Sequence, residues 1–91
     1  MTAVTDRIAV RVMVTDAWDF VPLVVEPHTT IADLKREALE RALRTPDVST
    51  DAYQVKFRGA PVLDESMTVG QLGARPGSPF IVLPARRRPV R

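Results

Sequence analysis

Residues 30–44 read TIADLKREALERALR, and this stretch decides the fold because it is the clearest amphipathic segment of the chain. Its apolar residues recur at helical spacing and form one stripe, as in a helix that packs against another layer. The stripe consists of Ile31, Leu34, Ala38, Leu39, Ala42 and Leu43. Thr29 or Thr30 can cap this helix, Thr30 and Asp33 have the spacing of a capping box, and Pro46 cannot continue a helix. The pattern predicts a helix over residues 30–44.

Two apolar segments before this helix predict an antiparallel hairpin. Residues 8–14 (IAVRVMV) alternate in a way that is typical of a strand with one buried face. After a polar break at residues 15–17, a second apolar run covers residues 18–26. Pro22 in that run has no N–H for a ladder, so we expect an edge strand or a bulge there.

Three further strands are expected after the helix. Residues 53–57 alternate like the first strand, residues 62–63 follow a turn at residues 59–61, and residues 80–83 form the last apolar run. Residues 66–72 are expected to form a short helical turn. Because a single helix must cover one face of the sheet, the chain is predicted to be an α+β domain with the helix packed across a mixed sheet. The first and last strands would pair in parallel at its centre.

Several short strings, in this order along the chain, resemble ubiquitin. They are residues 23–27 (LVVEP), Thr30-Ile31, Lys35, Phe57, Gly59, Leu63, Thr68-Val69 and residues 80–83 (FIVL). With the order β-β-α-β-β-turn-β, the chain therefore resembles the ubiquitin-like (β-grasp) superfamily over about residues 8–83. The implied organisation is a flexible N-terminus at residues 1–7, a ubiquitin-like domain at residues 8–84 and a disordered basic tail at residues 85–91. Such domains serve many roles, so the resemblance implies the fold more strongly than a function.

The C-terminal residues differ from those of the conjugated relatives. Ubiquitin-like modifiers and sulfur carriers of this fold end in Gly-Gly, which gives an activating enzyme access to the terminal carboxylate. Here residues 86–91 read RRRPVR, and the last glycine is Gly77. The resemblance thus implies a non-conjugated member, similar to the small ubiquitin-like accessory proteins of bacterial type VII secretion. A modifier or sulfur carrier with unconventional C-terminal chemistry is the alternative.

A protein-binding surface is expected on the first hairpin. If Val21, Leu23 and Val25 of the second strand face the helix, Phe20 and Val24 point outward beside Met13. Trp18 lies at the neighbouring turn. Large apolar side chains gathered on an outer face are typical of interfaces. A register shifted by one residue would bury them instead.

The resemblance adds three residues to this candidate surface. Lys56, Ile81 and Leu83 align with the apolar patch through which ubiquitin is recognised. A lysine at the centre of that patch implies partners other than those that recognise ubiquitin.

The charge is uneven along the chain. The net charge is +2, yet Arg86, Arg87, Arg88 and Arg91 lie in the last six residues, and acidic residues outnumber basic ones before them. This basic tail has three interpretations: contact with phosphates of nucleic acid or of an anionic membrane, a solubilising end, or a segment that orders on an acidic partner. The absence of interleaved aromatic residues weakens the nucleic-acid interpretation.

Enzymatic chemistry is not expected. The chain has no cysteine and one histidine, His28, so Ser-His, Cys-His and thiolate or histidine metal sites lack their residues. The adjacent Asp64 and Glu65 are expected to lie in a solvated turn, and the scattered glycines form no phosphate-binding loop. We expect no catalytic, cofactor-binding or metal-binding site and no small-molecule substrate.

The sequence therefore predicts a non-catalytic module that binds other proteins, as an adaptor or accessory subunit of a larger assembly. A cytoplasmic location is expected, because residues 1–6 do not resemble a signal peptide and no apolar run has the length of a membrane span. Exposed strand edges can pair with those of a second copy, so a homodimer formed by strand pairing is a further alternative.

Overall fold

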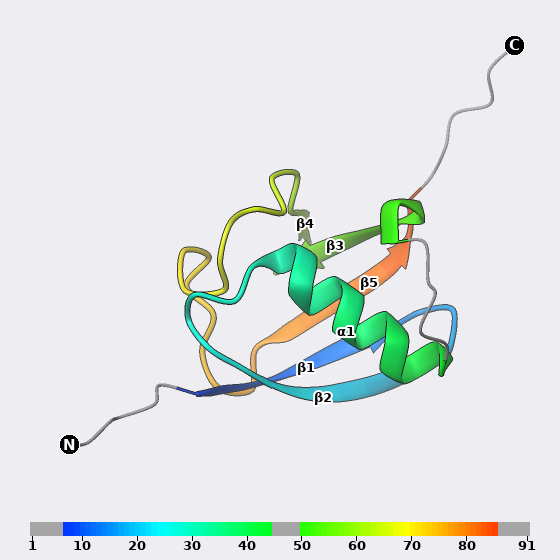
Figure 1. Cartoon of the computed structure of the whole chain (residues 1–91), viewed down its shortest axis with the longest axis horizontal. Helices are drawn as coiled ribbons and strands as arrows, with labels where there is room; N and C mark the ends of the chain where they lie inside the picture. The colour runs from blue at the N-terminus through cyan, green and yellow to red at the C-terminus, as the bar shows by residue number, and fades with distance from the viewer. Residues whose placement is uncertain (1–6, 45–49, 86–91) are drawn as a thin grey trace, which may run out of the picture.

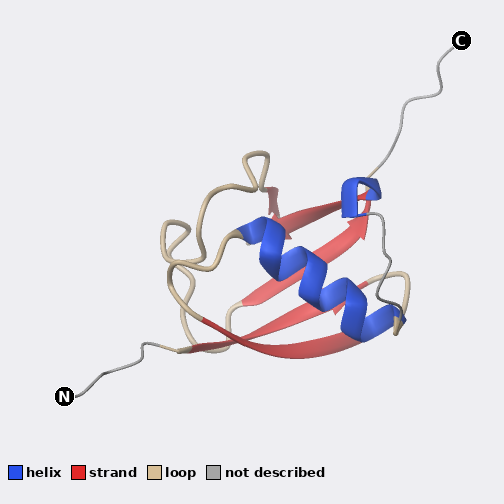
Figure 2. Ribbon diagram, in the orientation of Figure 1, coloured by secondary structure: helices blue, strands red, loops and turns tan. Residues whose placement is uncertain are grey.

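The computed structural model describes residues 7–44 and 50–85, which form one mixed sheet crossed on one face by a helix (Figures 1 and 2). The elements are β1 (Ile8–Val14), β2 (Asp19–Val25), α1 (Ile31–Leu43), a 3-10 turn (Thr50–Ala52), β3 (Tyr53–Phe57), β4 (Ala60–Pro61) and β5 (Pro79–Pro84). The strand order is β2-β1-β5-β3-β4. β1 and β5 pair in parallel, and the other neighbouring strands pair antiparallel. The predicted α+β architecture and its central parallel pair are confirmed.

The β1–β2 hairpin has an unbroken register, in which Ile8 faces Val25 and Val14 faces Asp19. Pro22 therefore lies in a regular edge strand, and the bulge considered as an alternative is absent from this hairpin. The N–H of Arg11, opposite Pro22, donates to Ser78 O on the other side of β1 at 3.1 Å. The Arg11–Pro22 pair is thus not hydrogen-bonded, and the N–H that proline lacks would have pointed away from the sheet.

Helix α1 begins as the sequence predicts and ends at a left-handed residue. Thr30 caps it, because its Oγ1 accepts a hydrogen bond from the Asp33 N–H at 3.2 Å. Arg44 follows the last helical residue with φ 58°, and its N–H donates to Glu40 O at 2.9 Å. The helix therefore matches the predicted span to within one residue at each end. Pro46, the expected stop, lies outside the described residues.

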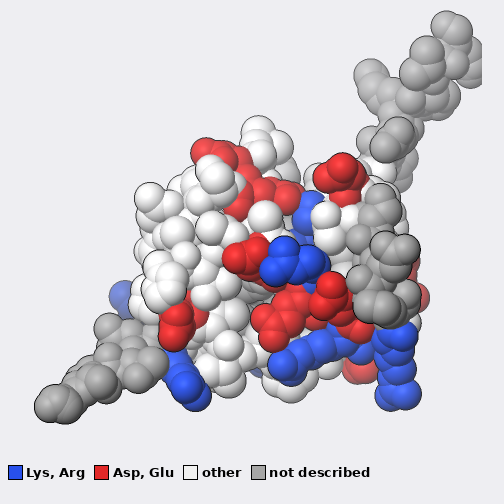
Figure 3. Space-filling view, viewed as in Figure 1, with Lys and Arg blue, Asp and Glu red and all other residues white. Residues whose placement is uncertain are grey.

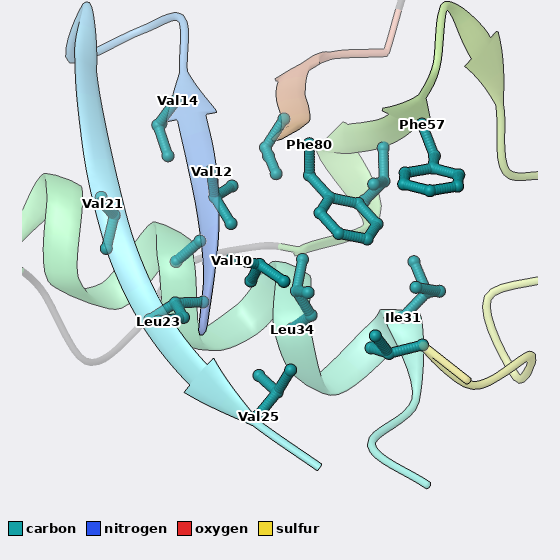
Figure 4. Packing of buried hydrophobic residues seen from close by; sticks show 14 of the residues in the cluster. Val10, Val12, Val14, Val21, Leu23, Val25, Ile31, Leu34, Phe57 and Phe80 are labelled. Atoms are coloured by element: carbon teal, nitrogen blue, oxygen red, sulfur yellow. The ribbon is translucent and has the colours of Figure 1, made fainter. Parts of the chain in front are cut away.

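The core lies between α1 and the inner face of the sheet (Figure 4). Side chains at alternate strand positions meet the apolar stripe of the helix there. The labelled members are Val10, Val12, Val14, Val21, Leu23, Val25, Ile31, Leu34, Phe57 and Phe80. The Phe57 and Phe80 rings stack with centroids 4.7 Å apart. This packing confirms the predicted inward and outward sets of the strands.

The predicted fourth strand at residues 62–63 was wrong by two residues. β4 is Ala60–Pro61, because Arg58 and Gly59 both have positive φ and complete the turn by themselves. Pairing with β3 consequently resumes at once, with Ala60 opposite Phe57. The turn assigned from sequence to residues 59–61 therefore begins one residue earlier.

Residues 66–72 form turns, among them one helical turn, as the sequence predicts. One helix-like bond links the Leu72 N–H to Thr68 O at 3.2 Å, and the chain then turns at Gly73. Gly70 is required by a close approach, since a Cβ there would lie 2.9 Å from Pro27 O. The segment is held to the start of α1 by the Thr30–Thr68 bridge.

A buried ion pair joins the helix to the loop after β4. Lys35 lies on α1 with its side chain 5% exposed, and its Nζ lies 2.7 Å from Glu65 Oε1. The same Nζ donates to Tyr53 O at 3.0 Å. Glu65 thus has a structural partner, which corrects the expectation that both acids of the Asp64–Glu65 turn are merely solvated. A buried ammonium needs such partners to remain charged.

Candidate protein-binding surface

The face of the sheet opposite α1 carries a row of side chains from all five strands. The cross-strand pairs are Phe20–Met13, Met13–Ile81, Ile81–Lys56 and Lys56–Pro61. We call this the outer row. Phe20 and Ile81 are 44% and 38% exposed, so the row presents apolar surface with a lysine near one end. Four of the predicted site residues (Met13, Phe20, Lys56 and Ile81) are therefore brought together.

The other predicted residues lie apart from the outer row. Leu83 is on the same face, opposite Gln54 of β3. Trp18 belongs to the turn at the end of the hairpin, and Val24 lies near the opposite end of β2, opposite Ala9. The strand spacing puts Val24 about 13 Å along β2 from Phe20. The structure thus divides the predicted surface into the outer row and three apolar residues outside it.

Sequence reasoning missed Arg11 as part of this surface. Its guanidinium lies over the Phe20 ring, 4.6 Å from the centroid, which is cation–π geometry. Alternation had assigned Arg11 to the face of Met13, but the contact depends on the register that sets Arg11 opposite Pro22. Together with Lys56, it gives the outer face cationic character on both sides of Ile81.

A second apolar surface, also missed, lies beside β4. It is a hollow of about 550 Å³, here called the β4 hollow. Its apolar lining includes Phe57, Val62, Met67 and Leu72. We call its exposed lining residues, among them Arg58 and Leu63, the rim. Leu63 is 89% exposed. The sequence contains one indication of this surface, an apolar residue, Leu63, shortly after a tight turn. The hollow itself forms only where the residues around β4 meet the segment that contains Met67 and Leu72.

Two carboxylates near these surfaces are hydrogen-bonded within the chain. Asp16 Oδ2 accepts from the Tyr53 hydroxyl at 2.6 Å, and this bond raises the pKa of Tyr53. Asp64 accepts from the Ser66 hydroxyl and N–H, which lowers the pKa of Asp64. Both contacts fix loops at their present positions.

The charged side chains on the helix side of the molecule are of mixed sign (Figure 3). Pairs such as Arg41–Glu37 at 3.1 Å and Arg36–Asp33 at 3.0 Å lie along α1. His28 is exposed in the loop before the helix, as expected, with its Nε2 2.9 Å from Glu26 Oε1. The described residues on this side of the molecule form no surface of a single sign.

The remaining predictions concern the basic tail, metal ligands and membrane-spanning helices. Arg86, Arg87, Arg88 and Arg91 lie outside the described residues. Within residues 7–44 and 50–85, no three histidine, cysteine or acidic side chains gather as metal ligands would. Across the same ranges, no helix combines the length and apolarity needed to span a bilayer.

Comparisons with known proteins identify the fold. No family model and no curated protein matches the sequence. The structure is similar to ubiquitin of Caldiarchaeum subterraneum, with a TM-score of 0.74 and 13% identity over 89% of this chain and 96% of that one. It is also similar to a ubiquitin-like domain of an Arabidopsis thaliana protein, with a TM-score of 0.72 and 16% identity over 99% and 89% of the two chains.

A third structure agrees with these two. A designed protein based on ubiquitin gives a TM-score of 0.68 and 18% identity over 85% of this chain and 87% of that one. At such identities the likeness shows the fold and not a role. The chain has the α+β ubiquitin-like fold, as the sequence resemblance implied.

Proposed function

We propose that this chain, with its ubiquitin-like fold, is a non-catalytic protein-interaction module that serves as an adaptor or accessory subunit of a larger assembly. The outer row carries the proposal. Phe20, Met13 and Ile81 expose contiguous apolar surface on the sheet face opposite the helix. Aromatic residues and methionine are enriched at protein interfaces, and an apolar patch of this kind is typical of a docking site.

The charges beside the outer row indicate the chemistry of its partner. Arg11 lies over Phe20, and Lys56 pairs with Ile81 across the sheet. A partner that presents an apolar centre with carboxylates at its rim would complement both features. The rim charges would mainly set the association rate and its salt dependence.

The test compares partner capture by variants of the full chain. Phe20→Ser and Ile81→Ser remove apolar surface from the outer row, and Val24→Thr is the matched control because Val24 is exposed on the same face but outside the row. Tagged chains expressed in the native cell are captured, and the bound proteins are quantified by mass spectrometry. We expect both serine variants to lose partners that the wild type and Val24→Thr retain.

Thermal melts of the same variants separate binding from folding. Substitutions at exposed positions change stability little, so the melting temperatures should stay close to that of the wild type. Lys56→Glu should weaken capture most at low salt. Unchanged capture by the serine variants, or a melt that collapses in both, would contradict the proposal.

A further inference from the structure

The turn between β1 and β2 holds a tryptophan in a conformation that suits glycine. Trp18 has φ 55° and is 77% exposed. The turn is closed by hydrogen bonds from the Ala17 N–H to Val14 O and from the Trp18 N–H to Thr15 O. A left-handed backbone is unfavourable for a bulky residue with a Cβ, and such strain concentrates at functional positions. Because most of the indole is exposed, it buries little surface against the described part of the chain.

The β4 hollow is the counterpart of this exposed side chain. Its volume of about 550 Å³ exceeds that of one aromatic side chain, and its walls are mainly apolar. Arg58 at the rim also has a left-handed backbone, with φ 56°, and its guanidinium lies 5.1 Å from the Phe57 ring centroid. The molecule thus carries an exposed apolar knob and an open apolar hollow.

The knob is flanked by acidic residues, whereas the hollow is lined by one basic and one acidic residue. Trp18 is followed by the exposed Asp19 and preceded at two residues by Asp16. Arg58 lies at the rim of the hollow. Asp64 lies at the same rim, and its negative charge would repel the acidic residues beside Trp18. Its carboxylate already accepts hydrogen bonds from Ser66. Asp19 beside the knob and Arg58 beside the hollow are the two groups of opposite charge that a contact between these surfaces could pair.

Trp18 cannot fill the hollow of its own chain. Asp16 beside it contacts Tyr53 at the beginning of β3, whereas the hollow lies at the other end of β3, around Phe57. In Figure 1 the β1–β2 turn and the loop after β4 lie at opposite ends of the sheet. β2 and β3 are also separated by two intervening strands, or roughly 14 Å across the sheet.

We propose that the chain self-associates head to tail, with Trp18 of one copy inserted into the β4 hollow of the next and Asp19 facing the neighbour's Arg58. The contact is heterologous, so repeated copies form a ring or an open chain instead of a closed dimer. It uses surfaces separate from the outer row, and it does not rest on the proposed function. The acidic residues beside Trp18 also disfavour insertion of this turn into an anionic membrane.

Sedimentation velocity of the full chain from micromolar to millimolar concentration tests this proposal. We expect the average mass of the wild type to rise with concentration. Trp18→Gly should weaken self-association by about tenfold or more, because an aromatic anchor is lost. Its urea midpoint should not fall, because glycine suits the left-handed turn. Leu63→Asp should have the same effect on association, by placing a carboxylate at the rim of the hollow.

A mixture of the two variants distinguishes head-to-tail contact from other modes. Trp18→Gly retains the hollow and Leu63→Asp retains the knob, so together they should form a one-to-one dimer but no larger species. Val24→Thr is the control and should associate like the wild type. A wild type that stays monomeric at millimolar concentration overturns the proposal, and Trp18 would then be a candidate contact for a different protein. Undiminished association of Trp18→Gly, or binding of the wild type to phosphatidylserine vesicles that Trp18→Gly loses, overturns it as well.

Discussion

The inner and outer faces of the sheet are built from alternate residues of the same strands, yet they differ in composition and burial. On β5, Phe80 and Val82 face the helix and are fully buried, whereas Ile81 between them is 38% exposed. The inner face is uniformly apolar, and the outer face mixes apolar side chains with Arg11 and Lys56. The difference shows that one face provides most of the stability of the fold, which leaves the composition of the other face less constrained.

The largest expected effect comes from breaking the inner face at β5. Phe80→Ala removes a stacked, fully buried ring and should lower the free energy of unfolding by about 3–5 kcal/mol, whereas Ile81→Ala should cost about 1 kcal/mol or less. Urea denaturation measures both. Phe80→Leu serves as a milder probe if the alanine variant does not fold. Equal losses at the two neighbouring positions would show that the outer face contributes as much to the stability of the fold as the inner face.

An intermediate effect is expected at the one charged side chain that is buried within the described residues. Glu65→Gln leaves the Lys35 ammonium buried without its countercharge and should destabilise the chain by about 1–3 kcal/mol. Lys35→Met keeps the volume of the side chain and removes the charge, so its loss should be smaller. Denaturant unfolding at neutral pH compares the two variants. A larger loss for Lys35→Met would show that the ion pair itself stabilises the fold.

The smallest effect is expected at the hydrogen bond that joins the β1–β2 turn to β3. Folding raises the pKa of Tyr53 above 10.0, chiefly through its bond to Asp16, so the protonated hydroxyl stabilises the folded state below that pH. This contribution should disappear as the pH rises through the raised pKa. The stability difference between the wild type and Tyr53→Phe should therefore shrink between about pH 8 and about pH 11. A difference that stays constant over this range would mean that the phenol does not titrate as proposed.

The regular elements were predictable because their signals are local. The stripe of α1 and the alternation of β1, β2, β3 and β5 each lie within one short segment of sequence. Thr30 also acts as the predicted cap. The prediction failed at β4, whose position depends on the backbone of Arg58 and Gly59. At residues 66–72 it gave the turn but not the contacts with distant segments that hold it, such as the Thr30–Thr68 bridge and the close approach of Gly70 to Pro27. Contacts between distant segments produce no periodic pattern within the segment itself, so they cannot be predicted from it.

The candidate surfaces were predictable to a lesser extent. Alternation placed Met13 and Phe20 on the outer face, and the resemblance added Ile81. The register of β1 between β2 and β5 makes the three residues neighbours. The place of Arg11 over Phe20 and the β4 hollow were missed, because each depends on residues from different elements that meet only in the folded chain.

The sequence by itself determined which elements form and which side of each strand is apolar, since helix and strand periods are properties of adjacent residues. Only the tertiary structure decided which outward side chains become one surface. Strand order and register place β2, β1, β5 and β3 side by side, and this spatial order differs from their order along the chain. It also decided that Lys35 is buried against Glu65 and that Trp18 and the β4 hollow lie too far apart to meet within one copy. These relations are distances in space between residues remote in sequence, and the folded sheet sets them.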